Sequence, residues 1–309
     1  MSKSPIVIVG NLADDHARTI HERLIARGHQ PFVLDAQEFP EQLPIALGEH
    51  LDEITIAGQR LARPAAVYVR SLYQSPGTYG VDADDAMKED WRRTLLAFRE
   101  RSTLLSAIVM RWEQLGVPLY NSPSSSANVT KPYQLALLAA AGLPVPKTLW
   151  TNDPEAVRRF CSEHEAIYKP VAGGAATRKV EARDLGDERL AKLAGAPVCF
   201  QELLPGDDVR VYVIEGRVIC ALRIVTDAID FRQNEQSIEV IELEPAVERE
   251  CIRAAEVIGL RYTGMDIKGD RAGRYRILEL NPSAMFLGFE ARTGVDIGGP
   301  LCAALLAHT

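Results

Sequence analysis

Residues 264–268 read GMDIK and residues 277–282 read ILELNP, two apolar runs that contain polar side chains. Both runs predict buried β-strands joined by a turn. Glu279 and Asn281 are two residues apart and therefore project from one face of their strand. Asp266 shares that face or the opposite one according to the register, which a shift of one residue reverses. Mg²⁺ prefers oxygen ligands, so Asp266, Glu279 and Asn281 are candidate metal ligands, with ordinary solvated strand ends as the alternative.

Two further carboxylates flank a predicted hairpin earlier in the chain. Glu202 lies near the end of an apolar strand expected at residues 198–203, and Asp208 opens the strand expected at residues 209–214. A glutamate beside exposed backbone is suited to the edge of an adenine base, and an aspartate to a ribose hydroxyl. Solvation of a hairpin end is the alternative interpretation. Both residues are therefore candidate nucleotide ligands.

Two lysines lie at positions where a bound anion would stabilise their positive charge. Lys169 lies in an otherwise apolar strand at residues 167–170, where an unpaired ammonium group is costly. Lys131 begins a predicted helix that ends at Gly142, and the positive end of the helix dipole favours an anion there. A phosphate group would pair with both lysines, although lysines at element ends are often only solvated. Phosphate binding is the hypothesis.

The start of the chain predicts a strand, a helix and a second strand. Residues 6–9 are continuously apolar, residues 16–27 have helical spacing, and residues 31–34 form another apolar run before Asp35. This order favours a parallel sheet with helices on its faces. An acidic residue after the second strand can bind a dinucleotide ribose, but residues 10–15 (GNLADD) lack the glycine fingerprint of such a site. Asp35 is therefore interpreted as an ordinary strand-end residue.

Helical spacing of large apolar residues continues over residues 84–115. The pattern predicts one long helix, or two helices broken near residues 101–103, whose apolar side faces the core or, alternatively, a second subunit. A strand at residues 65–70 precedes it, and the turn-rich run at residues 116–123 (GVPLYNSP) marks the first domain boundary. The apolar positions are Met87, Trp91, Leu95, Phe98, Leu105, Val109 and Trp112.

The composition excludes nucleic-acid and membrane functions. The 309 residues are 47% hydrophobic and 25% charged, typical of a globular protein with room for one or two domains. Acidic residues outnumber basic ones by 42 to 35, and the net charge of −7 disfavours non-specific nucleic-acid binding. No apolar run approaches the roughly 18 residues of a membrane-spanning helix. The apolar run at residues 6–9 is too short for a signal peptide.

The cysteines and histidines indicate a reducing compartment and no zinc site. The five cysteines are scattered and never form a CxxC pair, and the six histidines lack a metal-ligand spacing. We therefore expect a cytoplasmic protein.

The order of these groups resembles the ATP-grasp superfamily, and most closely its RimK-type carboxylate-amine ligases (alpha-L-glutamate ligase-like). The resemblance runs from about residue 121 to the C-terminus and rests on the combined order and spacing of loose motifs. They are Lys131, GLPVP at 142–146, YKP at 168–170, QEL at 201–203, DVR at 208–210, FRQN at 231–234, MD at 265–266, ELN at 279–281, GFE at 288–290 and TGVD at 293–296.

The resemblance implies a fold and a ligand set. The fold class would be α/β, with an α+β catalytic half: an N-terminal parallel α/β domain at residues 1–122, a small lid subdomain at 123–198 and a C-terminal subdomain with the Mg²⁺ site at 199–309. ATP would lie between the two subdomains. The implied ligands are Lys131, Lys169 and Asn234 for the phosphates, Glu202, Leu203 and Leu204 for the adenine, Asp208 for the ribose, and Asp266, Glu279 and Asn281 for one or two Mg²⁺ ions, with Mn²⁺ as a substitute.

The resemblance also implies the reaction. ATP would phosphorylate a carboxylate to an acyl phosphate, and an amine would attack it to give an amide, ADP and phosphate. Charge on the transferring phosphoryl group must be neutralised, and Arg232 or Arg223 is the arginine expected to assist the lysines and Mg²⁺. The substrate would be an amino acid, a peptide, a precursor peptide or a protein C-terminus. A peptide macrocyclase, an ATP-grasp kinase and a non-catalytic ATP-binding regulatory protein are the alternatives, and a homo-oligomer remains possible.

The chain departs from the family pattern at three places. Residues 172–179 (AGGAATRK) contain only two glycines where the family has a richer phosphate loop, which Arg178 or Lys179 would supplement. The run EQSI at residues 235–238 replaces a glycine-rich stretch near the acceptor site, so the resemblance predicts the substrate less well than the nucleotide. After Asn281 the family has Ser-Pro-Gly, whereas residues 282–285 of this chain read PSAM.

Overall fold

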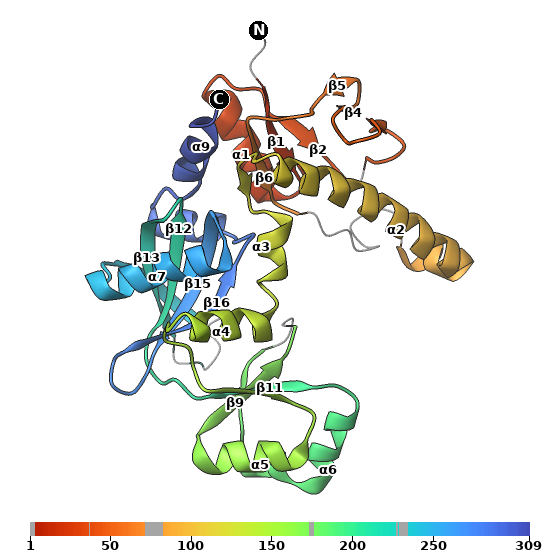
Figure 1. Cartoon of the computed structure of the whole chain (residues 1–309). Coiled ribbons are helices and arrows are strands. Elements are labelled where there is room, and N and C mark those ends of the chain that lie inside the picture. The colour runs from red at the N-terminus through yellow and green to blue at the C-terminus, as the bar shows by residue number, and fades with distance from the viewer. Residues whose placement is uncertain (1–3, 37, 72–82, 173–175, 227, 229–233) are drawn as a thin grey trace.

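The computed structural model describes residues 4–36, 38–71, 83–172, 176–226, 228 and 234–309. Figure 1 shows an N-terminal α/β part, a central sheet and a smaller sheet at the opposite end from the N-terminus. The expected mixed α/β fold with parallel and antiparallel sheets is confirmed. Within the described ranges, no helix is both long enough and apolar enough to span a bilayer.

The N-terminal part is built on the expected parallel sheet. Its strand order is β2-β1-β6-β7, and β1 pairs in parallel with both of its neighbours. Helix α1 (Asp15–Ala26) follows β1, and the Asp14 side chain caps it by accepting from the Ala17 amide. The strands are β1 (Ile6–Val9), β2 (Phe32–Leu34), β6 (Ala66–Val69) and β7 (Leu119–Tyr120). A small antiparallel sheet of β3 (Ile45–Leu47), β4 (Ile54–Ile56) and β5 (Gln59–Arg60) was not expected, because strands this short carry little periodicity.

Helix α2 (Ala83–Gln114) is continuous through residues 101–103, and its non-helical backbone lies at Asp90. Its later apolar residues, including Val109 and Trp112, are buried in the core of the N-terminal part. Trp91 and Leu95, in the earlier half, are exposed. The single apolar side expected from the spacing therefore divides into a buried half and an exposed half.

A four-stranded antiparallel sheet forms the smaller part, with strand order β10-β9-β11-β8. Helix α5 (Pro154–Glu163) covers it, with Val157 and Phe200 in the shared core. The expected boundary between residues 198 and 199 falls at the start of β11, which pairs with β8 and β9. The strands are β8 (Thr148–Thr151), β9 (Ala166–Pro170), β10 (Arg178–Lys179) and β11 (Val198–Glu202), and the short helices are η2 (Ala182–Leu185), α6 (Asp187–Leu190) and η3 (Ala191–Ala194).

The central sheet has five antiparallel strands in the order β14-β13-β12-β15-β16. One face packs on α4 (Lys131–Ala140) and α7 (Pro245–Ile258) through residues such as Val211 and Met265. On the other face, Tyr212 and Tyr262 belong to a core that includes α1, β1 and α9. The strands are β12 (Asp208–Ile214), β13 (Arg217–Thr226), β14 (Glu235–Ile241), β15 (Tyr262–Gly269) and β16 (Tyr275–Asn281).

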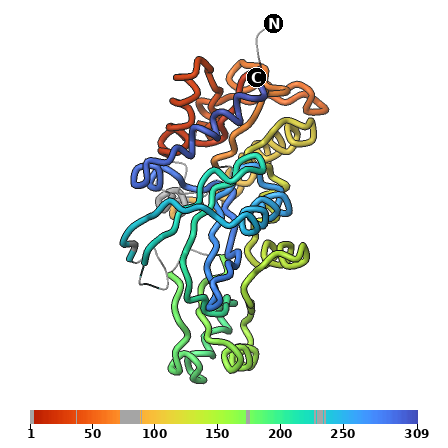
Figure 2. Tube along the Cα trace, turned by 90° about the vertical axis from the view of Figure 1, so that its left-hand side faces the viewer, coloured from red at the N-terminus to blue at the C-terminus, as the bar shows by residue number. Residues whose placement is uncertain are grey.

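The C-terminal segment returns to the N-terminal part. Helix α9 (Gly298–Leu306) lies against α1, as Figures 1 and 2 show, and its Leu301 and Leu305 are buried beside Ile20 and Leu24. The N-terminal and central parts therefore share one hydrophobic core. The remaining helices are α3 (Pro123–Ala127) and α8 (Leu287–Thr293).

Candidate active site

A cavity of about 340 Å³ lies between the smaller sheet and the central sheet. The smaller sheet contributes residues from β9 and β11, and the central sheet contributes residues from β12, β15 and β16. Nine residues expected from the sequence line it: Lys131, Lys169, Glu202, Leu203, Leu204, Asp208, Asp266, Glu279 and Asn281. The fold thus brings together side chains that are up to 150 positions apart, from Lys131 to Asn281.

The three candidate metal ligands share one face of the central sheet. Asp266 pairs with Glu279 and Gly264 with Asn281 across β15 and β16, which settles the register that the sequence left open. Their neighbours Met265 and Leu280 point into the core on the opposite face. Among the described residues no group of three or more His, Cys, Asp and Glu side chains is arranged to hold a metal. The set here is two carboxylates and an amide, which suits a hard cation that keeps water or phosphate oxygens as further ligands.

Cations already balance the two carboxylates. Lys131 Nζ lies 2.5 Å from Glu279 Oε2, and Arg210 Nη1 lies 3.0 Å from Asp266 Oδ1. The Asn281 amide also donates to Glu279 Oε1 at 3.3 Å. Both carboxylates are mostly shielded, with side-chain exposures of 24% for Glu279 and 18% for Asp266.

The local environment separates the pKa values of the two carboxylates. Burial raises the pKa of Asp266 to about 6, with Glu279 adding to the shift and Arg210 opposing it. Burial also acts to raise the pKa of Glu279, but the charge and hydrogen bond of Lys131 outweigh it and hold that pKa below its usual value. A divalent cation would favour the ionised form of both groups.

Lys169 projects from β9 towards the same cavity. Its Nζ donates to Gln201 Oε1 at 3.1 Å, and the Gln201 amide in turn donates to Thr148 Oγ1 at 2.9 Å. Burial lowers the pKa of Lys169. The direct partner is thus a neutral amide, and an anionic group in the cavity would favour the charged form of the lysine.

The segment between β11 and β12 connects the two sheets beside the cavity. Glu202 Oε1 accepts from the Lys147 amide at 2.8 Å, which orients the carboxylate at the end of β11. Leu203 and the buried Leu204 follow and line the cavity. Asp208 is paired with Lys268, so a ribose hydroxyl at Asp208 would share the carboxylate with that lysine.

Arg223 was expected in the site, and the structure places it elsewhere. Arg223 is the cross-strand partner of Val209, whose side chain points into the core on the α4 and α7 face, away from the face that carries Asp208. The guanidinium is 40% exposed and pairs with Glu239 and Asp207. Arg223 is therefore absent from the described lining of the cavity.

Two other residues were expected in the site, Asn234 and Arg232. Asn234 is exposed, its carbonyl accepts from Thr226 Oγ1 at 2.7 Å, and it is not part of the described cavity lining. Arg232 lies outside the described residues, as do Gly173 and Gly174 of the predicted phosphate loop.

Arg210 lines the cavity, although no role was expected for it from the sequence. Besides Asp266, its Nη1 reaches the Gly264 carbonyl at 3.1 Å, and only 11% of the side chain is exposed. The Nε atom is buried with no partner among the described residues. The spacing of Asp208 and Arg210 could have indicated this position. Residues two apart in a strand project from the same face, so Arg210 shares the face of Asp208.

Comparison with known proteins now identifies the family. A RimK-like ATP-grasp domain is matched over residues 129–305, more than half of the chain. The chain belongs to the RimK-like ATP-grasp family. It is 28% identical over 208 residues to a probable alpha-L-glutamate ligase of Thioalkalivibrio sulfidiphilus, an alignment that covers 63% of this chain and 69% of the relative.

Solved ATP-grasp ligases match the entire fold. The ATP-grasp ligase PsnB, complexed with a phosphomimetic variant of a minimal precursor, Mg and ADP, is 64% identical, with a TM-score of 0.93 and 99% of each chain covered. The macrocyclase MdnC of Microcystis aeruginosa, bound to its precursor peptide MdnA, shares the fold at 21% identity, with a TM-score of 0.82 and coverage of 98% of this chain and 100% of that one. This chain is thus an ATP-grasp ligase, and the expected enzyme class is confirmed.

Proposed function

We propose that this ligase uses ATP and Mg²⁺ to activate a carboxylate of a precursor peptide, which an amine then attacks to form an amide. The gathering of Lys131, Lys169, Asp266, Glu279 and Asn281 around one cavity is the observation that carries this proposal. Two ammonium groups and three side chains with oxygen ligands around one cavity match the phosphates and metal of a nucleotide. The likeness to PsnB, which was solved with Mg and ADP, supports the same ligands here.

The nucleotide would lie along the junction of the two sheets. Residues Leu203 and Leu204 offer backbone groups and apolar surface to the adenine, and Glu202 supplies an acceptor at its edge. Asp208, next along the chain, would meet the ribose. The phosphates would then extend towards Lys169 at one side and the carboxylates at the other.

Mg²⁺ held by Asp266, Glu279 and Asn281 would neutralise charge on the phosphates during transfer. Lys131 now rests on Glu279, so arrival of the metal would release its ammonium group towards a phosphate oxygen. Arg210 stays beside Asp266 and fixes the direction of that carboxylate. The donors are set before the reaction starts, which is the arrangement that stabilises developing charge most effectively.

The reaction balances without a further reagent. A carboxylate oxygen of the peptide attacks the terminal phosphorus of ATP, the bond from that phosphorus to the bridging oxygen breaks, and ADP leaves. An amine nitrogen then attacks the acyl carbon, loses a proton and expels inorganic phosphate. The comparisons favour this ligase chemistry over the kinase and regulatory alternatives, because the matched relatives and structures are ligases.

The peptide substrate is proposed from PsnB, which was also solved with precursor peptide PsnA2 and AMPPNP. Ligation within one such peptide would make this chain a macrocyclase. A cytoplasmic location belongs to the same proposal, supported by the need for ATP and by five cysteines that are all free thiols.

The proposal is tested by incubating the protein with ATP, Mg²⁺ and a peptide. The peptide is either PsnA2 or a synthetic copy of a precursor peptide encoded beside the gene for this chain. We expect ADP release that depends on the peptide. Where the amine belongs to the same peptide, the product should be lighter than the substrate by one water for each bond formed. Hydroxylamine added during turnover should divert the activated carboxylate to a hydroxamate. ATP consumption that gives a stable phosphopeptide, or no consumption with either peptide, would contradict the ligase proposal.

Lys169→Ala is expected to weaken ATP binding about tenfold to a hundredfold, because a charged hydrogen bond to phosphate is lost. Titration calorimetry with ATP measures the change. Lys192→Ala provides the control, since Lys192 is an exposed lysine of the same part of the chain, in η3. Equal affinities for the wild type and the Lys169 variant would refute the phosphate role of Lys169.

A further inference from the structure

Residues 282–286 follow the proposed metal ligand Asn281 directly, and Ser283, Ala284 and Met285 line the cavity. Each of the first four carbonyl groups in this segment accepts a hydrogen bond from a side chain elsewhere in the fold. The donors are Asn121 Nδ2 to Pro282 (2.6 Å), Arg70 Nη1 to Ser283 (2.6 Å), the Tyr262 hydroxyl to Ala284 (2.6 Å) and the Tyr212 hydroxyl to Met285 (2.5 Å). The segment is therefore held at consecutive positions.

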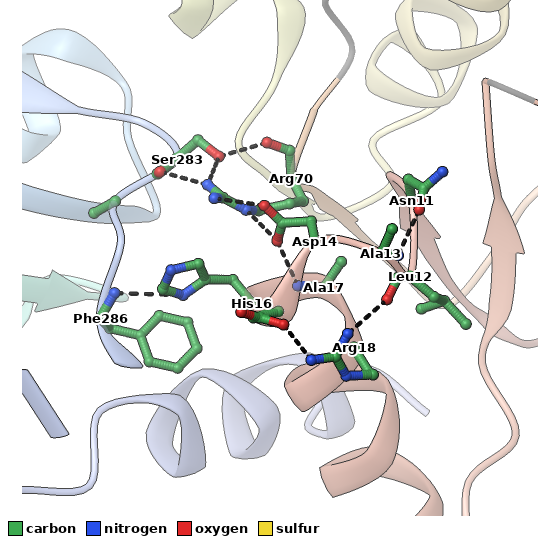
Figure 3. A network of polar contacts seen from close by, with 12 residues as sticks. Asn11, Leu12, Ala13, Asp14, His16, Ala17, Arg18, Arg70, Ser283 and Phe286 are labelled. Atoms are coloured by element: carbon green, nitrogen blue, oxygen red, sulfur yellow. Dashed lines mark hydrogen bonds and ion pairs between the residues drawn. The ribbon is translucent and has the colours of Figure 1, made fainter. Parts of the chain in front are cut away.

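Arg70 makes the most extensive of these contacts, and it comes from the N-terminal part, at the end of β6 (Figure 3). Its Nη1 donates to both the carbonyl and the hydroxyl oxygen of Ser283 at 2.6 Å. The Ser283 hydroxyl donates back to the Arg70 carbonyl at 2.5 Å. The two residues thus form a reciprocal contact across 213 positions of sequence.

Asp14 fixes the Arg70 guanidinium from the opposite side. Its two carboxylate oxygens accept from Arg70 Nε and Nη2, each at 2.9 Å, in the paired geometry that orients a guanidinium best. Asp14 is itself fixed as the cap of α1. Burial acts to raise its pKa, but the hydrogen bond and charge of Arg70 outweigh this effect and lower it. Only 11% of the Arg70 side chain is exposed.

Close packing makes the segment sensitive to small shifts. A Cβ atom placed on Gly264 would lie 2.6 Å from the Ala284 Cβ, so only glycine at position 264 allows this approach. Phe286 at the end of the segment contacts His16 of α1, with ring centroids 4.8 Å apart and its amide donating to His16 Nδ1 at 3.4 Å. The N-terminal part therefore contacts the segment at three points, through Asn121, Arg70 and His16, and Figure 3 shows the last two.

We propose that Arg70, oriented by Asp14, is a positioning residue through which the N-terminal domain fixes residues 282–286 and, with them, the metal ligand Asn281. This inference rests on the metal site proposed above. Arg70 is not among the described residues that line the cavity and acts through Ser283, two residues after Asn281. Residues that orient a metal ligand commonly change metal affinity about tenfold to a hundredfold when they are replaced.

The chain contains a matched comparison for a purely structural tie. Arg23 of α1 pairs with Glu290 of α8 at 2.6 Å, which also links the N-terminal part to the C-terminal segment through an arginine and a carboxylate. Arg23 is absent from the described lining of the cavity. Loss of either pair should lower stability, but only loss of the Arg70 contact should change the metal site.

Titration of the full-length protein with Mn²⁺ in the presence of ADP, followed by electron paramagnetic resonance, tests this inference. We expect Arg70→Met to weaken Mn²⁺ binding about tenfold, with ADP affinity in the absence of metal unchanged. Arg23→Met should bind Mn²⁺ as the wild type does, even where its thermal midpoint falls. Equal Mn²⁺ affinity in the Arg70 variant and the wild type would overturn the positioning role, whereas no Mn²⁺ binding by the wild type would overturn the metal site itself.

Ser283→Ala keeps the test decisive if Arg70→Met does not fold. It removes the hydroxyl contacts to Arg70 and keeps the carbonyl contact, so we expect a smaller loss of Mn²⁺ affinity in the same direction. Hydrogen exchange should show faster exchange at the amides of residues 283–286 in this variant and not in Arg23→Met. Unchanged exchange together with unchanged Mn²⁺ affinity would contradict the proposal.

Discussion

Asp266→Asn and Glu279→Gln are each expected to lower turnover by about a hundredfold to a thousandfold while leaving the fold intact. Each change removes one ionised oxygen ligand from the proposed metal site and keeps the size of the side chain. Both residues lie opposite each other on β15 and β16, so the loss of either leaves the ion with one carboxylate. ADP release in the presence of peptide measures the effect.

Glu239→Gln is the matched control for both variants. Glu239 is also a carboxylate of the central sheet, but it pairs with Arg223 and is not among the described residues that line the cavity. Its substitution should leave turnover within about twofold of the wild type, as is usual for surface pairs. Full activity in Asp266→Asn or Glu279→Gln, with circular dichroism spectra like that of the wild type, would contradict the metal assignment.

Arg210→Met is expected to have the second largest effect, on both stability and turnover. Asp266 would be left buried without its cation, which costs about 3–5 kcal/mol when the carboxylate is charged. Turnover should fall about a hundredfold because Asp266 would lose its fixed direction. Denaturant unfolding at pH 8 and peptide-dependent ADP release measure the two effects.

Two further variants separate these effects. Arg210→Met combined with Asp266→Asn should recover much of the lost stability, since no buried charge remains, and should recover no activity. Arg223→Met should change turnover little, because that guanidinium is exposed and paired outside the cavity. A larger loss of turnover in Arg223→Met than in Arg210→Met would restore the expectation drawn from the sequence alone.

Residue periodicity predicted that two of the proposed metal ligands share one face of a strand. Glu279 and Asn281 are two apart in a strand, which places them on one face in any register. Motif order also brought together residues that the fold gathers, since Lys131, Lys169 and Glu202 all line the cavity. Local patterns succeed here because each residue lies at or near the end of a regular element.

Other features depend on pairings that no local pattern contains. The position of Asp266 required the register of β15 against β16, and the position of Arg223 required its register against Val209. The contact between Arg70 and Ser283 joins residues 213 positions apart, and no local pattern links the two. Such contacts follow from how the N-terminal and central parts share a core, which is a property of the assembled fold.

The central claim is that ATP activates a carboxylate of the peptide through an acyl phosphate. Turnover of PsnA2 labelled with heavy oxygen in its side-chain carboxylates tests this claim most directly. We predict that, for each amide formed, one labelled oxygen appears in inorganic phosphate, because the carboxylate oxygen that attacked the phosphorus leaves with the phosphoryl group. Phosphate without label, released in step with the ligated product, would contradict the account.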